Sequence, residues 1–89
     1  MVTDRRLRRD LLRMLEQLRD PDYPRFITRY AIEDTVFNAP QPKYVRRKIT
    51  EALRDLNLSE EGKIFHYVPW TAPSGPNRVY IKAEKEGGN

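Results

Sequence analysis

The side chains best suited to chemistry lie between positions 41 and 54. Four cations and no acid occur from Lys43 to Lys48. Arginine is suited to bidentate contacts with phosphate or guanine, and amides and hydroxyls can contact bases or backbone. The pattern therefore favours binding to a nucleic acid. The candidate contact residues are Gln41, Lys43, Tyr44, Arg46, Arg47, Thr50, Arg54 and Arg78.

Arg47 is the strongest single candidate in this segment. On a helical wheel it lies directly opposite the apolar side, so we expect it to contact guanine or phosphate. Gln41 and Thr50 are expected to read bases, and Tyr44 to touch phosphate. The alternative is a solvated helix face with ion pairs between successive turns, such as Arg47 with Glu51.

The same sequence offers little for catalysis. It contains one histidine, His66, and no cysteine, and its acids are scattered. No glycine-rich phosphate loop is present. Asp34 lies near the apolar side of its helix, where a cap or an ion pair is the ordinary explanation. We therefore expect no enzymatic activity, no catalytic residues, no metal site and no cofactor.

Composition adds to the charge argument. The 89 residues carry 17 Lys and Arg against 13 Asp and Glu, with a net charge of +4 and a pI near 9.6. A pI above about 9 in a small domain is typical of nucleic-acid binding. No apolar run approaches the ~20 residues of a membrane helix, and the start has no apolar signal region. We expect a cytoplasmic protein that makes no membrane contact.

Hydrophobic spacing predicts three helices, over residues 4–19, 29–37 and 43–57. The first has a leucine-rich stripe, and the third has a clean apolar side, with Lys48 near it. In the second, Thr28 is expected as N-cap and Asn38 near the end. We expect that helix to bury Ala31, Ile32, Thr35 and Val36.

Segments rich in β-forming residues surround the helices. Residues 25–27 are expected to be extended, and residues 63–70 and 78–83 to pair as a hairpin around a Pro- and Gly-containing loop. The resulting order is helix, extended piece, helix, turn, helix, hairpin. This order resembles the winged helix-turn-helix superfamily of DNA-binding domains, over about residues 4–83. The residues that carry the resemblance are Phe26-Ile27-Thr28, Val45-Arg46-Arg47-Lys48-Ile49 with Ala52-Leu53, Glu61-Gly62-Lys63-Ile64, and Arg78-Val79-Tyr80-Ile81.

The resemblance implies an α+β winged helix-turn-helix, in which three helices are followed by a β-hairpin wing. It implies a single domain over residues 1–83, and we expect residues 84–89 to form a disordered tail. Its partner would be double-stranded DNA, with the helix at about 42–56 in the major groove and the 63–83 hairpin as the wing. A role in transcription regulation follows. The sequence departs from the usual pattern in its longer, proline-rich link between the second and third helices.

Three alternatives stay open. The leucine stripe of the first helix is wide enough for a homodimer contact, and Arg5, Arg6, Arg8 and Arg9 can touch phosphate or solvent. A winged helix can also serve as a protein interaction module in a transcription or replication assembly, through the rings of Phe65, Tyr67, Trp70 and Tyr80. RNA binding is the third alternative.

Overall fold

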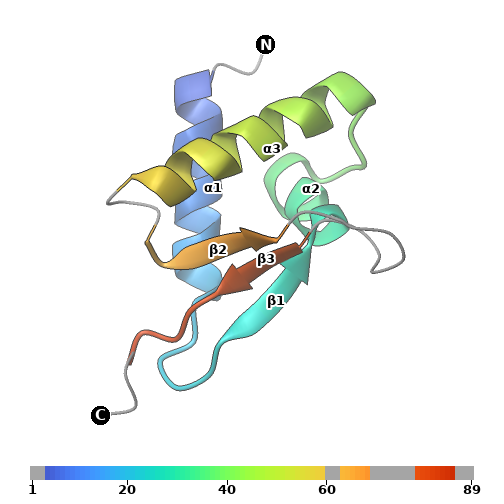
Figure 1. The fold of residues 1–89 in the computed structure, drawn as a ribbon. Coiled ribbons are helices and arrows are strands. Elements are labelled where there is room, and N and C mark those ends of the chain that lie inside the picture. Colours follow the sequence, from blue (N-terminus) through green and yellow to red (C-terminus); the bar gives the residue numbers. More distant parts are fainter. Residues whose placement is uncertain (1–3, 60–62, 69–77, 86–89) are drawn as a thin grey trace.

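The fold of this chain is described by a computed structural model that covers residues 4–59, 63–68 and 78–85. The order of elements is α1 (Asp4–Leu18), β1 (Arg25–Thr28), α2 (Arg29–Phe37), α3 (Lys43–Leu58), β2 (Phe65–Val68) and β3 (Arg78–Ile81). Within these residues the architecture is three helices and a three-stranded antiparallel sheet (Figure 1). The α+β class predicted from the sequence is confirmed.

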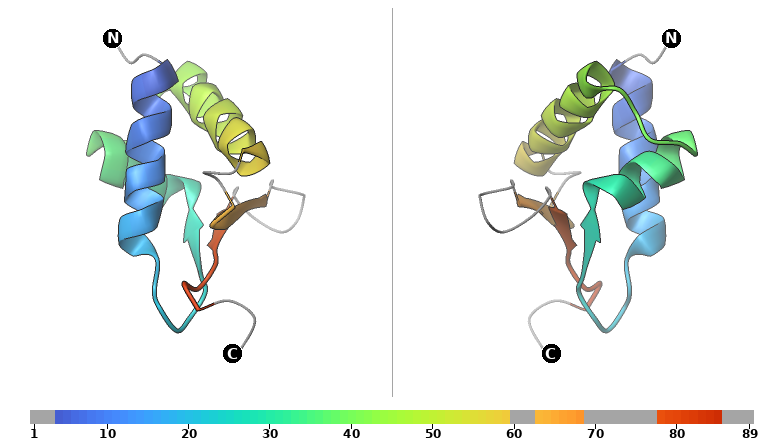
Figure 2. Two further views of the ribbon diagram at one scale, coloured as in Figure 1. Left: turned by 90° about the vertical axis from the view of Figure 1, so that its left-hand side faces the viewer. Right: turned by 90° about the vertical axis from the view of Figure 1, so that its right-hand side faces the viewer.

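The sheet supplies one wall of the core. Its strand order is β1-β3-β2, so the last strand lies between the other two. Ile27 is paired with Val79, and Phe65 with Ile81, and all four side chains are buried. Figure 2 shows α1 and α2 on one side of the sheet and α3 above it. The side chains on the opposite face of the strands, such as Phe26 and His66, are exposed.

The leucine stripe of helix α1 packs inside the domain. Leu7, Leu11, Met14 and Leu15 are buried there, and only Leu12 and Leu18 are partly exposed. Burial of these side chains stabilises the fold because it removes apolar surface from water. Most of the apolar residues that the sequence predicted for a homodimer contact are therefore buried in the core of the chain itself. A dimer through this helix stays a prediction.

Helix α2 has both predicted end residues. The hydroxyl of Thr28 accepts a hydrogen bond from the amide of Ala31 at 3.3 Å. Asn38 ends the helix in the left-handed region with φ of 59°, and its amide donates to the carbonyl of Asp34 at 2.8 Å. Asparagine tolerates that backbone conformation better than most residues.

The predicted buried face of α2 is wrong in part. Ala31 and Thr35 are exposed, whereas Ile32 and Glu33 are buried and Val36 is half-buried. The helix is turned so that a charged residue enters the core, which a pattern of apolar residues does not reveal. Asp34, which the sequence places near the apolar side of this helix, is exposed as well.

Helix α3 is fixed to the sheet by Asn57. Its side-chain amide donates to the carbonyl of Phe65, and its side-chain oxygen accepts from the amide of Tyr67 at 3.3 Å. One side chain thus satisfies a donor and an acceptor on β2, the edge strand beneath the helix.

The chain after β3 also makes contacts. The amide of Glu84 donates to the carbonyl of Asp20 at 3.0 Å, and the amide of Lys85 to that of Pro21 at 3.1 Å. The expectation of disorder from Glu84 onward is therefore corrected for these two residues, because the loop after α1 holds their backbone. Residues 86–89, Gly62, Trp70 and the expected hairpin tip at 69–77 lie outside the described residues.

Candidate nucleic-acid interface

Helix α3 is seated by its apolar side. Val45, Ile49, Ala52, Leu53 and Leu56 are all buried. They contact the same core as α1 and the sheet. Since these side chains occupy one side of the helix, its opposite side is directed to solvent.

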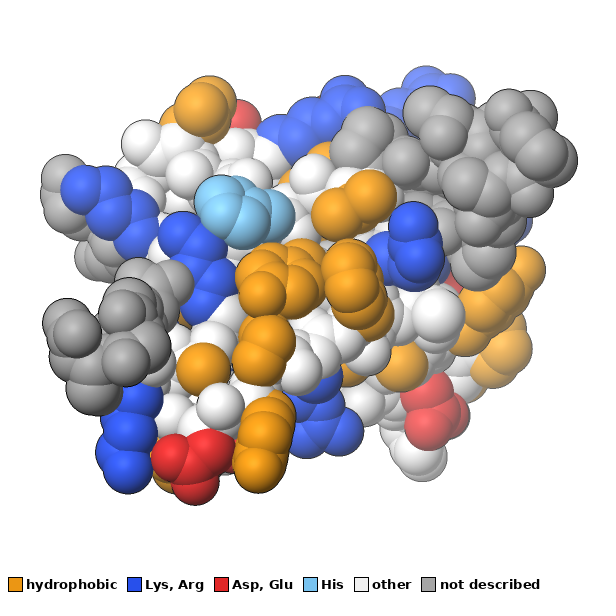
Figure 3. Space-filling view, turned by 60° about the horizontal axis from the view of Figure 1, so that its bottom comes forward, with side chains coloured by type: hydrophobic (Ala, Val, Ile, Leu, Met, Phe, Trp, Pro, Cys, Tyr) orange, Lys and Arg blue, Asp and Glu red, His pale blue; other side chains and the backbone are white. Residues whose placement is uncertain are grey.

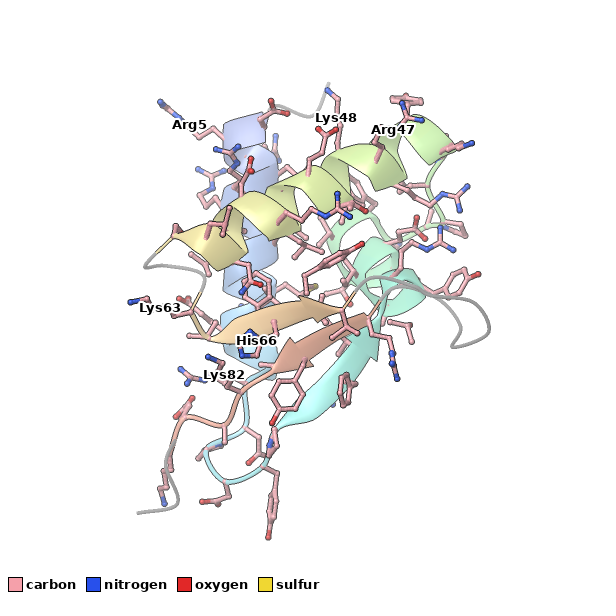
Figure 4. All side chains as sticks on the ribbon, in the orientation of Figure 1. Arg5, Arg47, Lys48, Lys63, His66 and Lys82 are labelled. Atoms are coloured by element: carbon pink, nitrogen blue, oxygen red, sulfur yellow. The ribbon has the colours of Figure 1, made fainter. Side chains whose placement is uncertain are left out.

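The exposed side of the first half of α3 is cationic. Lys43, Arg47 and Lys48 are all exposed. Figure 4 shows Arg47 and Lys48 extending from α3 on the side away from the sheet. Lys48, expected nearer the apolar side, is exposed, because the core closes around Val45 and Ile49 and leaves Lys48 outside. These three residues are called the α3 cationic face below.

The α3 cationic face is not neutralised within the part of the chain that the structure describes. There, Lys43, Arg47 and Lys48 form no ion pair, and the pairing of Arg47 with Glu51 weighed above does not occur. These charges are therefore available to an anionic partner.

The N-terminus of α3 adds to this face. Pro42 occupies the cap position and provides no side-chain hydrogen bond, and the first turn contains no acid. The carbonyl of Pro42 accepts from the amides of Val45 and Arg46 at 3.0 and 3.1 Å. The positive end of the helix dipole thus lies beside Lys43 and the exposed Tyr44, which is an arrangement that favours phosphate.

Three predicted contact residues are instead engaged within the protein. The side-chain amide of Gln41 donates to the carbonyls of Ala39 and Pro40 at 3.0 and 3.3 Å. The hydroxyl of Thr50 donates to the carbonyl of Arg46 at 3.1 Å. Arg46 itself is half-buried and turned toward α2. Each of these side chains thus has a polar partner within the protein, and its contact with a nucleic acid stays a prediction.

Two further arginines lie over aromatic rings. The guanidinium carbon of Arg54 is 5.4 Å from the ring centroid of Tyr67, so this arginine lies between α3 and β2. The same atom of Arg78 is 5.1 Å from the ring centroid of Phe26. Arg78 begins β3, so it lies at the base of the hairpin. In both, the guanidinium group lies over an aromatic ring, an arrangement that attracts a cation to the ring face.

Glu33 is the site residue that sequence reasoning missed. Its side chain is almost fully buried, and its Oε1 lies 3.8 Å from Nε of Arg46 and 4.0 Å from Nη1 of Arg29. The carboxylate thus joins α2 to the first turns of α3. A signal was present, because Arg29 and Glu33 are four residues apart on the face that also carries Ile32.

The arginines of α1 lie on another surface. A groove of about 680 Å³ separates the outer side of α1 from the C-terminal half of α3. Arg8 crosses it to form an ion pair with Asp55. The groove is lined by Arg5, Arg8, Arg9, Leu12, Arg13, Glu16, Asp55, Leu56 and Ser59. Glu16 and Asp55 offset part of the positive charge of this groove. The residues of the α3 cationic face form no such ion pair within the described part of the chain.

No protein-family model, curated protein or solved structure matches this chain. Within residues 4–59, 63–68 and 78–85, no group of three or more His, Cys, Asp or Glu side chains could hold a metal ion. Among the helices of that same part of the chain, none has the length and apolar character needed to cross a membrane.

Proposed function

We propose that this chain is a small DNA-binding protein of the winged helix-turn-helix type that regulates transcription. In this proposal α3 lies in the major groove of double-stranded DNA, and the β2–β3 hairpin acts as the wing. The major groove, about 12 Å wide, admits an α-helix.

The observation that carries the proposal is the two-sided character of α3. Five apolar residues fix one side of the helix in the core, while Lys43, Arg47 and Lys48 are exposed on the other and unpaired among the described residues. A helix presented in this way has a rigid base and an unneutralised face for a polyanion. The uncapped N-terminus of α3 supports the same orientation, because its amides and dipole favour phosphate.

The second support is the order and pairing of the elements. Helix, strand, helix, helix and hairpin follow one another, and β1 pairs with the strand that returns from the hairpin. This arrangement is compatible with a winged helix. Arg78 lies at the base of the hairpin, over the Phe26 ring on the outer face of the sheet, so it is not part of the α3 cationic face.

The protein interaction alternative has weaker support. It requires the aromatic rings of the hairpin to form an exposed patch. Phe65, however, is fully buried, and Tyr67 and Tyr80 are partly buried. RNA binding draws on the same charges as DNA binding, so the experiment must separate the two.

The proposal is tested by anisotropy titrations of labelled duplex DNA, single-stranded DNA and duplex RNA in parallel, after selection of bound sites from random DNA duplexes. We expect tightest binding to the selected DNA duplex. With about five phosphates neutralised, log K should fall against log salt with a slope of about −4 to −5. A slope near zero, or equal affinity for duplex RNA, would contradict the proposal.

A further inference from the structure

The outer face of the sheet carries a row of rings that α3 does not use. Phe26 is paired across the sheet with Tyr80, which is also paired with His66 on its other side. The Phe26 and Tyr80 centroids are 5.0 Å apart, and the His66 and Tyr80 rings are nearly parallel at 6.2 Å. Phe26 is 54% exposed, and His66 is exposed. We call Phe26, Tyr80 and His66 the ring row.

Positive charge borders the ring row. Arg78 lies two residues before Tyr80 on the same face, with its guanidinium carbon 5.1 Å from the Phe26 centroid. The three strands contain no Asp or Glu at any of their positions. Figure 3 views this face and shows hydrophobic side chains gathered beside the histidine, with Lys and Arg around them and Asp or Glu nearer the margins.

We infer that the ring row binds single-stranded nucleic acid by stacking its bases, with Arg78 contacting a phosphate. Bases exposed in a single strand stack on aromatic side chains, and a nearby cation holds the backbone. A duplex keeps its bases stacked inside, so this face would select unpaired strands. The inference concerns a different surface from the α3 cationic face and does not depend on the proposed function.

A protein partner fits this face less well than a nucleic acid. Stable protein interfaces bury about 800 Å² on each partner around an apolar centre. Here the outward side chains of the strands are Phe26, Thr28, His66, Val68, Arg78 and Tyr80, of which only Phe26 is a strongly exposed apolar group. Rings that alternate with polar and cationic groups, without acids, instead match the surface of a nucleotide strand.

The two surfaces are also separate in space. Figure 4 shows His66 on the sheet, whereas Arg47 and Lys48 extend from α3 away from it. Substitutions in one surface are therefore expected to leave the other intact.

The test is the affinity of the full chain for labelled oligo-dT and oligo-U of about 15 nucleotides, a length within the range of single-strand sites. We expect saturable binding that Phe26→Leu and Tyr80→Leu each weaken roughly tenfold or more, since each removes a stacking ring. Tyr30→Leu is the matched control, because Tyr30 is 58% exposed but belongs to α2. It should bind both oligonucleotides as the unmodified chain does.

Two readouts keep the outcome clear. Phe26→Leu should retain the unfolding midpoint, because Phe26 is exposed. This variant therefore tests the role of the ring row even if Tyr80→Leu unfolds. It should also retain affinity for duplex DNA. The inference is overturned if neither oligonucleotide binds saturably, if Phe26→Leu binds as well as the unmodified chain, or if Arg47→Ala weakens oligonucleotide binding more than Phe26→Leu does. If the unmodified chain binds the oligonucleotides but does not bind duplex DNA, the proposed function is contradicted and this inference stands.

Discussion

The carboxylate of Glu33 faces the guanidinium group of Arg46, with 3.8 Å between Oε1 and Nε. Glu33 belongs to α2 and Arg46 to the first turns of α3, so this pair joins the two helices of the proposed DNA-binding unit. Both atoms are buried and neither has a hydrogen-bond partner among the described residues. The pair is thus a contact of opposite charges, not a hydrogen bond, between α2 and α3.

Removal of this carboxylate should weaken the fold. We expect Glu33→Ala to lower the free energy of unfolding by about 1–3 kcal/mol, less than for a fully buried pair because the arginine partners can reach solvent. Urea denaturation followed by circular dichroism measures the loss. Glu51→Ala is the matched control, since Glu51 is exposed on α3, and should change stability by no more than about 0.5 kcal/mol. Equal effects of the two substitutions would show that Glu33 has no special role.

Asn57 should stabilise the contact between α3 and β2. Asn57→Ala would leave the carbonyl of Phe65 and the amide of Tyr67 without their partner. We expect a loss of about 1–3 kcal/mol and faster hydrogen exchange at the Tyr67 amide. Gln17→Ala, an exposed position on α1, serves as control and should change neither quantity. Unchanged exchange at Tyr67 would mean that the bond contributes nothing to the hairpin.

Arg47 should contribute to duplex affinity. We expect Arg47→Ala to weaken binding to the selected duplex by about 1–3 kcal/mol and to relax preference at one base position, if the side chain contacts a base. A phosphate contact would instead lower the salt slope by about one. Arg13→Ala removes another exposed arginine from α1 and is the control. If both variants bind the duplex equally well, Arg47 is not part of the interface.

Regular apolar spacing made the helices predictable. The stripes of α1 and α3 place leucine and other aliphatic residues on one side, and their bounds differ from the predicted ones by a single residue. The caps of α2 were predictable too, because the side chain of Thr28 and the backbone tolerance of Asn38 are local properties. Pairing of β1 with β3 joins residues far apart in sequence, so spacing alone does not determine it.

The candidate site was predictable only where it depends on one helix. The exposure of Lys43 and Arg47 follows from the wheel of α3. The contact of Arg46 with Glu33 does not follow from that wheel, because Glu33 belongs to another helix. The buried face of α2 was misjudged for the same reason, since hydrophobicity assigns a glutamate to solvent and takes no account of the arginines that balance it.

The contact of α3 with duplex DNA is tested most directly by nuclear magnetic resonance. The full chain, labelled with ¹⁵N, is titrated with the selected duplex while backbone amide shifts are followed. We expect the largest changes at the amides of residues 43–48, where the α3 cationic face meets the uncapped helix end. Changes that are concentrated on the sheet or on α1, with the amides of 43–48 unmoved, would contradict the proposed placement of α3 in the groove.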